Sequence, residues 1–301
     1  MADQPPVCDY EGSQYQQTFW DTGTRAYEDQ SEAHALRALL PQQGRLLLEI
    51  GAGAGRNTPR YAGFDRIVLL DYSRTQLEQA RARLGDSPRY LYVAANVYAL
   101  PFVPGLFDAA TMIRVIHHLA DAPAALRQVR QVLAPGGTFI LEFANKLNLK
   151  AIVRWLLRRQ QWNPFDPAPV EFAALNFNFH PGTMLGWLRA HELPPRQVRS
   201  LSYLRVGALK RAVPTGALVA LDALLQPTGQ LVQLSPSVFV RAEATGPGPR
   251  ATAGQFFRCP VCGSAELADE GQALHCAGCG RRWAVRDGIY DFKEPAEAGP
   301  S

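Results

Sequence analysis

The chain has 301 residues, of which 47% are hydrophobic and 19% are charged, so it can build the core of one large domain or two smaller ones. Its formal net charge of +4 is too small to indicate an acidic partner for the chain as a whole. Residues 1–12 lack the apolar core of a signal peptide, and the longest apolar stretch, residues 216–225, is far shorter than the ~20 residues of a membrane span. We therefore expect a soluble, cytoplasmic protein without a transmembrane segment.

The first predicted elements are a helix, a buried strand and a ligand-binding turn. Residues 31–40 begin with a serine that can cap a helix and end before a proline. Residues 46–50 are an aliphatic run with one acid, as in a strand that is covered on both faces. Gly51, Gly53 and Gly55 follow, and glycine allows positive φ and a close approach of the backbone to a bound molecule.

The spacing of these glycines separates two classes of cofactor. A dinucleotide fingerprint needs its third glycine at the position of Arg56. Residues 49–55 instead resemble Glu-x-Gly-x-Gly-x-Gly, the first motif of class I methyltransferases that use S-adenosylmethionine. A tight turn in an unrelated α/β protein is the alternative at this point. In the methyltransferases an N-terminal segment often covers the cofactor, and the aromatic and basic residues 19–27 either do so here or only pack an N-terminal arm.

A βαβ unit continues from the glycine turn. Residues 66–70 are aliphatic and run into Asp71, and an acid at the end of a second parallel strand can accept hydrogen bonds from both ribose hydroxyls of an adenosine. Ser73 caps the following helix and Gly85 ends it. Residues 89–94 form the next strand, so the unit predicts adenosine binding at the strand ends.

Residues 96–102 resemble a further methyltransferase motif, Gly-Asp-Ala-x-x-Leu-Pro-Phe. In the family its acid meets the adenine amino group, and the next backbone N–H meets the ring. Asn96 replaces the acid here, and its side-chain oxygen can still accept a hydrogen bond from that amine. The resemblance gives the backbone contact to Val97.

A fourth strand, over residues 109–115, leads into two adjacent histidines. The sequence Arg-Val-Ile-His-His-Leu at its end resembles the strand end that lies between cofactor and substrate in small-molecule methyltransferases. A helix over 122–133 and a strand over 138–143 follow. Because histidine titrates near neutral pH, His117 or His118 could take a proton from an oxygen or carbon nucleophile, or could instead orient substrate or pack.

The resemblance places the cofactor contacts at these strand ends. They are Glu49, Gly51, Ala52, Gly53, Asp71, Tyr72, Asn96, Val97 and Arg114. The fourth strand lacks the Asn-Pro-Pro-Tyr type of motif that holds an amine or amide in related N-methyltransferases. This absence argues against adenine or glutamine as the methyl acceptor.

Two insertions, at about 145–195 and 205–235, depart from the common methyltransferase core. Strands over 196–204 and 237–242 accompany them and bring the expected strand count to seven, with the last strand antiparallel to its neighbours. In this family such insertions build the substrate pocket, so we expect them to form a lid.

Positive charge is concentrated in one segment, which begins with the first insertion and extends beyond it. Residues 145–212 contain 11 Lys and Arg against 3 Asp and Glu. Residues 147–159 predict an amphipathic helix that carries Lys150, Arg154 and Arg158 on one face. Such a helix touches a membrane surface or an anionic partner, or it serves as a lid whose apolar side lines the pocket.

The C-terminal part predicts a second module. Residues 244–254 have the small, Gly- and Pro-rich composition of a linker. Two Cys-x-x-Cys pairs follow, and four thiolates satisfy a structural zinc ion: Cys259, Cys262, Cys276 and Cys279. The run Cys-Gly-Arg-Arg-Trp-Ala-Val-Arg-Asp-Gly-Ile at residues 279–289 resembles small zinc-ribbon proteins that bind and activate methyltransferases acting on tRNA and translation factors, so we expect a zinc ribbon over residues 255–301. Cys8 has no assigned role.

The sequence as a whole predicts an α/β protein. We expect a Rossmann-like, seven-stranded methyltransferase sheet with helices on both faces over residues 1–243, plus a small C-terminal zinc ribbon. The expected activity is methyl transfer from S-adenosylmethionine to an O or C nucleophile of a small or lipid-like molecule. An RNA or protein methyltransferase, and a regulator that binds S-adenosylmethionine without turnover, are the alternatives. Nucleic acid and a membrane surface both stay open as partners.

Overall fold

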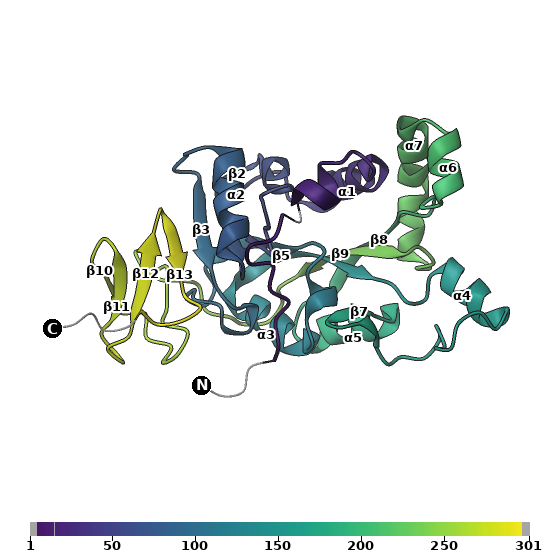
Figure 1. Cartoon of the computed structure of the whole chain (residues 1–301). Helices are drawn as coiled ribbons and strands as arrows, with labels where there is room; N and C mark the ends of the chain where they lie inside the picture. Colours follow the sequence, from purple (N-terminus) through teal and green to yellow (C-terminus); the bar gives the residue numbers. More distant parts are fainter. Residues whose placement is uncertain (1–4, 15, 297–301) are drawn as a thin grey trace.

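The computed structural model describes residues 5–14 and 16–296. Its centre is a mixed sheet that has eleven strands within these residues, in the order β10-β11-β12-β13-β3-β2-β1-β4-β5-β9-β8 (Figure 1). The strands are β1 (Gly44–Ile50), β2 (Phe64–Asp71), β3 (Tyr90–Ala94), β4 (Phe107–Met112), β5 (Leu133–Ala144), β8 (Pro195–Leu201), β9 (Ser237–Glu243), β10 (Leu267–Asp269), β11 (Ala273–Cys276), β12 (Arg282–Arg286) and β13 (Ile289–Asp291). A separate hairpin pairs β6 (Val170–Ala173) with β7 (Asn176–Asn178).

Five parallel strands form the middle of the sheet. β1 pairs in parallel with β2 and β4, β2 with β3, and β4 with β5. β9 is antiparallel to both β5 and β8. All seven strands expected for the methyltransferase sheet have counterparts in β1–β5, β8 and β9. Because parallel strands end at the same edge, the ends of β1, β2, β3 and β4 meet there.

The sheet is larger than the expected seven strands because the C-terminal segment joins it. β13 pairs in parallel with β3, and the N–H of Phe292 donates to the carbonyl of Ala94 at 2.8 Å. Phe257 lies between Phe102 and Phe292, with ring centroids 5.8 and 5.1 Å apart. The hydrophobic core therefore continues from the main sheet into the C-terminal segment, residues 255–296, which we call the ribbon. Without β13, β3 would be an edge strand with unpaired backbone N–H and C=O groups. The spacing of the cysteines in the sequence does not indicate whether the C-terminal segment covers that edge.

Helices cover both faces, as expected. They are α1 (Ala26–Leu39), α2 (Arg74–Leu84), α3 (Ala122–Val132), α4 (Leu149–Leu156), α5 (Pro181–Ala190), α6 (Gly207–Ala212) and α7 (Thr215–Leu225), with short turns η1 (Gln16–Trp20), η2 (Thr58–Tyr61), η3 (Val97–Ala99), η4 (Ile116–His118) and η5 (Gln226–Gln230). Residues of α1 and α2 pack on one face of the sheet, and residues of α3 and α5 pack on the other.

Several boundaries differ from the sequence prediction. Ser31 does not cap the first helix, because α1 starts five residues earlier and Ser31 is buried inside it. Tyr27 explains the extension, since its buried hydroxyl donates to Asp222 of α7 at 2.9 Å and fixes this first turn. β4 ends at Met112 rather than at residue 115, and Arg114 has a positive φ of 60°.

The linker and the insertions connect these layers. Residues 244–254 contain no helix or strand and lie against the main sheet: the N–H of Ala251 donates to the carbonyl of Gly105 at 3.1 Å. α4 lies at the opposite end of the molecule from the ribbon (Figure 1). No helix within the described residues is long and apolar enough to cross a membrane. Residues 297–301, the end of the expected ribbon, lie outside the described part.

Candidate cofactor pocket and cysteine cluster

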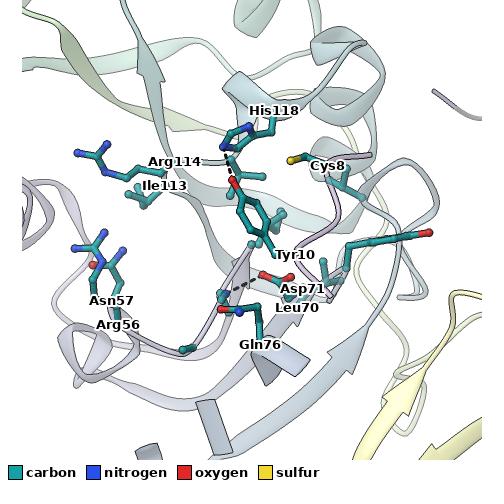
Figure 2. Close-up of a pocket in the computed structure, with 18 of the residues that line it drawn as sticks. Cys8, Tyr10, Arg56, Asn57, Leu70, Asp71, Gln76, Ile113, Arg114 and His118 are labelled. Atoms are coloured by element: carbon teal, nitrogen blue, oxygen red, sulfur yellow. Dashed lines mark hydrogen bonds between the residues drawn. The ribbon is translucent and has the colours of Figure 1, made fainter. Parts of the chain in front are cut away.

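A pocket opens where β1, β2, β3 and β4 end (Figure 2). Its walls come from the glycine turn, the ends of β2 and β3, the loop after β4, and the N-terminal arm. The lining residues on the strand side are Ile50–Ala54, Arg56, Asn57, Leu70–Tyr72, Gln76, Ala95, Val97, Ile113–Val115, His118 and Leu119. Most of the predicted contacts thus come together in one cavity.

The glycine turn is shaped by its lack of side chains. Gly51 has a φ of 67°, and a Cβ there would lie 2.1 Å from a methyl carbon of Val115. Gly53 has a φ of 52°, and its N–H donates to Oδ2 of Asp71 at 2.8 Å. Both positions therefore require glycine for its backbone conformation. At Gly51 the close approach of the loop after β4 is a second reason.

Asp71 is held by backbone donors from two elements. Oδ2 accepts from Gly53, and Oδ1 accepts from the N–H of Ser73 at 2.9 Å. Burial raises the pKa of Asp71 despite these hydrogen bonds. Each carboxylate oxygen has a second lone pair, so the side chain can still accept from hydroxyl groups in the pocket.

Glu49 and Asn96 lie beside the pocket without lining it. Glu49 is buried, accepts from the hydroxyls of Thr58 at 2.6 Å and Tyr61 at 3.3 Å, and has its pKa raised by burial to about 7. Oδ1 of Asn96 accepts from the N–H of Tyr98 at 3.0 Å and caps η3. In place of Asn96, its neighbours Ala95 and Val97 face the cavity.

Arg114 belongs to a buried ionic network. Its Nε donates to Glu32 at 2.7 Å, and Arg56 donates to the other oxygen of Glu32 at 2.8 Å. The Arg114 N–H donates to Glu142 at 2.9 Å, which holds the positive φ in place. Arg114 and Arg56 lower the pKa of Glu32 against the opposing effect of its burial. Both arginines line the pocket with their charges already paired.

The N-terminal arm forms the remaining wall of the pocket. Val7, Cys8, Tyr10, Gln16 and Trp20 line it. Glu11 fixes the arm to the start of α2 by accepting from the backbone N–H groups of Arg74 at 2.9 Å and Thr75 at 3.1 Å. The guanidinium of Arg56 lies 3.7 Å from the centre of the Trp20 ring.

The two histidines have different surroundings. His118 lines the pocket; its Nδ1 lies 3.0 Å from the carbonyl of Leu175, and its Nε2 lies 3.4 Å from the hydroxyl of Tyr10, which extends across the cavity (Figure 2). A carbonyl only accepts, so Nδ1 carries the proton and Nε2 is left as the acceptor. His117 is nearly enclosed, and its Nδ1 makes no hydrogen bond within the described residues. Burial lowers the pKa of both rings, so both are neutral at pH 7.

The four cysteines of the C-terminal segment form a separate cluster. Their Sγ atoms all lie within 4.8 Å of one another. The Sγ atoms of Cys259 and Cys279 are 3.7 Å apart, and those of Cys262 and Cys276 are 3.5 Å apart. Zinc–sulfur bonds of about 2.3 Å in a tetrahedron place the sulfurs about 3.8 Å apart. The donor set and its spacing therefore fit a tetrahedral metal ion.

Two contacts connect the ribbon with the cofactor pocket. The ammonium group of Lys293 lies 5.3 Å from the centre of the Tyr72 ring, which lines the pocket. Lys293 also lies 3.6 Å from the carboxylate of Glu11 in the N-terminal arm. The ribbon thus touches the wall of the pocket from outside.

Comparison with known proteins agrees with this geometry. Residues 48–141 match the family model described as "Methyltransferase domain". Over these residues the chain is similar to methyltransferase domains. It is 33% identical to the O-methyltransferase cnsE of Penicillium expansum over 34% of this chain and 39% of that protein. It is also 33% identical to the ubiquinone/menaquinone biosynthesis C-methyltransferase UbiE of Shewanella frigidimarina, over 37% of this chain and 47% of that protein. The chain thus matches less than half the length of these relatives.

The fold extends beyond the matched domain. A chain from the complex between the Haloferax volcanii Trm112 methyltransferase activator and the putative methyltransferase aligns over 77% of this chain and 96% of its own length. The TM-score is 0.55 and the sequence identity is 16%, so the likeness concerns the fold. Rossmann-like methyltransferase architecture therefore describes most of the molecule.

Sequence reasoning did not find every residue of the site. Tyr10, Gln76, Leu70 and Ile113 line the pocket without belonging to any quoted motif. Strand-end position gave a usable signal for Leu70 and Ile113, since each lies beside a predicted contact. No local pattern indicates that Tyr10, which is 108 residues from His118 in sequence, reaches it.

Proposed function

We propose that the protein transfers a methyl group from S-adenosylmethionine to an O or C nucleophile of a small or lipid-like molecule. The observation that carries this proposal is the pair of polar groups on opposite sides of one pocket: Asp71 at the end of β2 and Nε2 of His118 after β4. The cnsE and UbiE relatives, named as O- and C-methyltransferases, support the reaction class.

The residues present fit the cofactor. Asp71 would accept from ribose hydroxyls, and the backbone at Gly51 and Gly53 permits a close approach. Leu70 and Val97 offer apolar walls for an adenine ring. When bound, S-adenosylmethionine supplies an electrophilic methyl group. The protein's contribution is to hold an acceptor against that group, because alignment provides most of the acceleration in such a transfer.

His118 is the residue placed to move a proton. Its Nδ1–H is fixed by the carbonyl of Leu175, so Nε2 can accept the proton of an acceptor hydroxyl or an activated carbon. The Tyr10 hydroxyl stands within 3.4 Å of that nitrogen and marks the direction from which a hydroxyl can approach. His117 has no comparable access, and we assign it a packing role.

A small or lipid-like acceptor fits the surroundings of His118. The β6–β7 hairpin of the first insertion lies against η4, and Phe177 of that hairpin stacks with Phe179 at 6.4 Å between ring centroids. An RNA or protein acceptor was the alternative supported by the ribbon and the basic segment. Within the basic segment, α4 lies at the opposite end of the molecule from the ribbon (Figure 1), so the ribbon and the basic residues of α4 do not form one continuous binding track.

The cysteine cluster would hold one structural zinc ion. A segment of about 45 residues cannot bury enough surface to fold alone, and a metal ion would supply the missing folding energy. With four sulfurs as ligands no coordination position stays open, so the ion would take no part in methyl transfer. Free thiols fit a reducing compartment such as the cytoplasm.

The test combines cofactor binding with turnover. Calorimetry should show binding of S-adenosylmethionine and of its demethylated product, weakened at least about 10-fold in Asp71→Ala, since charge-assisted hydrogen bonds contribute ~1.5–3 kcal/mol. Asp65→Ala is the matched control, because Asp65 is an exposed acid of the same strand. Transfer of labelled methyl groups into fractions of a cell extract then identifies the acceptor class.

Equal binding by Asp71→Ala and the parent would remove Asp71 from the cofactor site. Binding without any methyl transfer would favour the regulator over the enzyme. Label in RNA or protein fractions would overturn the small-molecule acceptor.

A further inference from the structure

Exposed large apolar side chains gather in the two insertions. Eleven such residues of the described chain lie there: Leu149, Val153, Leu156, Leu157, Phe165, Phe172, Val206, Leu221, Leu224, Leu231 and Val232. Four of them lie on α4 or directly after it. Together with Lys150, Arg154, Arg158 and Arg159, those four leucine and valine residues form what we call the α4 surface.

The helix α4 has its apolar stripe turned outward. Successive residues of an α-helix are 100° apart, so Leu149, Val153 and Leu156 share one stripe. Their exposed fractions are 57%, 45% and 65%, whereas the exposed fraction of Ala151, on another side of the helix, is 4%. A surface helix of a globular protein normally buries its apolar stripe. Here that stripe is left for a partner outside the chain.

Basic residues flank the stripe without counterions. Lys150, Arg154, Arg158 and Arg159 are all exposed, and none has an ion pair to any residue of 5–14 or 16–296. The arginines beside the cofactor pocket differ, since Arg56 and Arg114 share the buried Glu32. The charge of the α4 surface is therefore available to an external anion.

Arg158 also breaks a local backbone preference. It has a φ of 55°, and it ends α4 in a left-handed turn in which the N–H of Arg159 donates to the carbonyl of Arg154 at 2.7 Å. Glycine is the usual residue at this position because it has no Cβ penalty. An arginine here adds charge at a conformational cost.

We propose that the α4 surface docks the protein on a lipid bilayer that contains anionic phospholipids. An amphipathic helix of this kind lies in the interface with its apolar stripe in the acyl boundary and its basic residues at the headgroups. Charge complementarity selects this occupant. A second copy of the chain would bring eight like charges together, and a nucleic acid would leave the apolar stripe in water.

Neighbouring segments extend the surface. The N–H of Leu149 donates to the carbonyl of Leu234 at 2.9 Å, which brings the segment containing Leu231 and Val232 to the start of α4. Leu231 is 90% exposed. Docking thus engages more than one turn of helix, and it stands independently of the acceptor because its test measures binding alone.

Vesicle flotation with the full chain tests the proposal. Vesicles of phosphatidylcholine with phosphatidylglycerol should retain the protein, and vesicles of phosphatidylcholine alone should not. Arg154→Glu/Arg158→Glu should lower the partition coefficient by at least about 30-fold, because each basic residue near an anionic surface contributes about 5-fold. Leu149→Ser/Leu156→Ser should also release the protein, which separates insertion from simple charge attraction.

The control changes charge equally at another place. Arg37→Glu/Arg127→Glu alters two exposed arginines of α1 and α3 and should retain binding. Absence of parent binding to anionic vesicles, or an equal loss in this control, overturns the proposal. A dimer in sedimentation that Leu149→Ser/Leu156→Ser dissociates, or binding to an acidic protein with no binding to vesicles, would assign the surface to that partner instead.

Discussion

The ribbon and the first insertion reach the same pocket from opposite sides. At one end the ribbon extends the sheet beyond β3 and places Lys293 5.3 Å from the ring of Tyr72, on the side of Asp71. On the other side, the β6–β7 hairpin of the first insertion reaches the pocket through Leu175, whose carbonyl lies 3.0 Å from Nδ1 of His118. The ribbon therefore contacts the proposed cofactor side, and the insertion contacts the proposed acceptor side.

The ribbon and the first insertion also differ in where their apolar side chains lie. In the ribbon, Trp283 is buried at 1% exposure and Phe292 at 4%, so its apolar residues are used inside the chain. In α4, the large apolar residues Leu149, Val153 and Leu156 face outward. From this contrast we propose that the ribbon serves stability and cofactor affinity, and that the insertion serves the acceptor and its surroundings. Changes at one end should leave the function of the other end largely intact.

Loss of the metal ligands should give the largest effect. Cys276→Ser/Cys279→Ser should abolish zinc binding, which contributes ~10–16 kcal/mol in isolated zinc-finger peptides, and should unfold the ribbon. β3 would then lose its partner β13, and the affinity for S-adenosylmethionine should fall because Ala95 and Tyr72 lie beside that edge. Elemental analysis, thermal unfolding and calorimetry measure the three effects.

Cys8→Ser is the matched control for the zinc content of the ribbon variant. Cys8 lies outside the cluster, so this variant should still bind about one zinc ion per chain. Full zinc content in the double variant would refute the metal site. An unfolded ribbon with unchanged cofactor affinity would show that Lys293 and β13 have no influence on the pocket.

The sequence predicted the two ends unequally. The glycine turn and the Cys-x-x-Cys pairs are local patterns whose residue types are dictated by backbone conformation or ligand chemistry, so they could be read directly. The pairing of β13 with β3 depends on partners about two hundred residues apart, and no local pattern encodes it. Ser31 shows a related failure, because packing of Tyr27 on Asp222 outweighs a good capping residue.

The candidate site shows the same division. Asp71 and His118 follow predicted strands and were found, whereas the contact of Tyr10 with His118 results from the path of the N-terminal arm. Asn96 is expected at the adenine, and the structure shows in addition that its Oδ1 accepts from the N–H of Tyr98 and caps η3. Side chains next to a turn have competing backbone donors, and sequence alone does not say which donor they take.

Removing the proposed base should give the next largest effect. His118→Asn should lower kcat/KM by about 100-fold or more, the usual range for a general base, with cofactor affinity unchanged. Burial lowers the pKa of His118, so its ring is neutral at pH 7 and activity should fall only as the pH drops through that lowered value, below ~6.5. The acidic limb of the pH–rate profile should disappear in the variant.

His34→Asn provides the control for this measurement. His34 lies in α1 and does not line the pocket, so the variant should keep both the rate and the acidic limb. A His118→Asn enzyme with the parent's rate and pH profile would reassign His118 to positioning or packing. A rate loss accompanied by an equal loss of cofactor affinity would point to damage of the pocket as a whole.

The smallest expected effect concerns the end of α4, where the variant should be more stable than the parent. Arg158→Gly should raise the free energy of unfolding by about 1 kcal/mol, because glycine adopts the left-handed conformation without the penalty of a Cβ. The same variant should bind anionic vesicles about 5-fold more weakly, because it loses one basic residue. Arg154→Gly is the matched control: it removes an equal charge from the helix interior, where glycine should lower stability by about 1 kcal/mol. Urea denaturation distinguishes the two variants. If Arg158→Gly were less stable than the parent, arginine would have no conformational cost in the left-handed turn. Arg158 would then no longer support the α4 surface as one that retains charge against backbone preference.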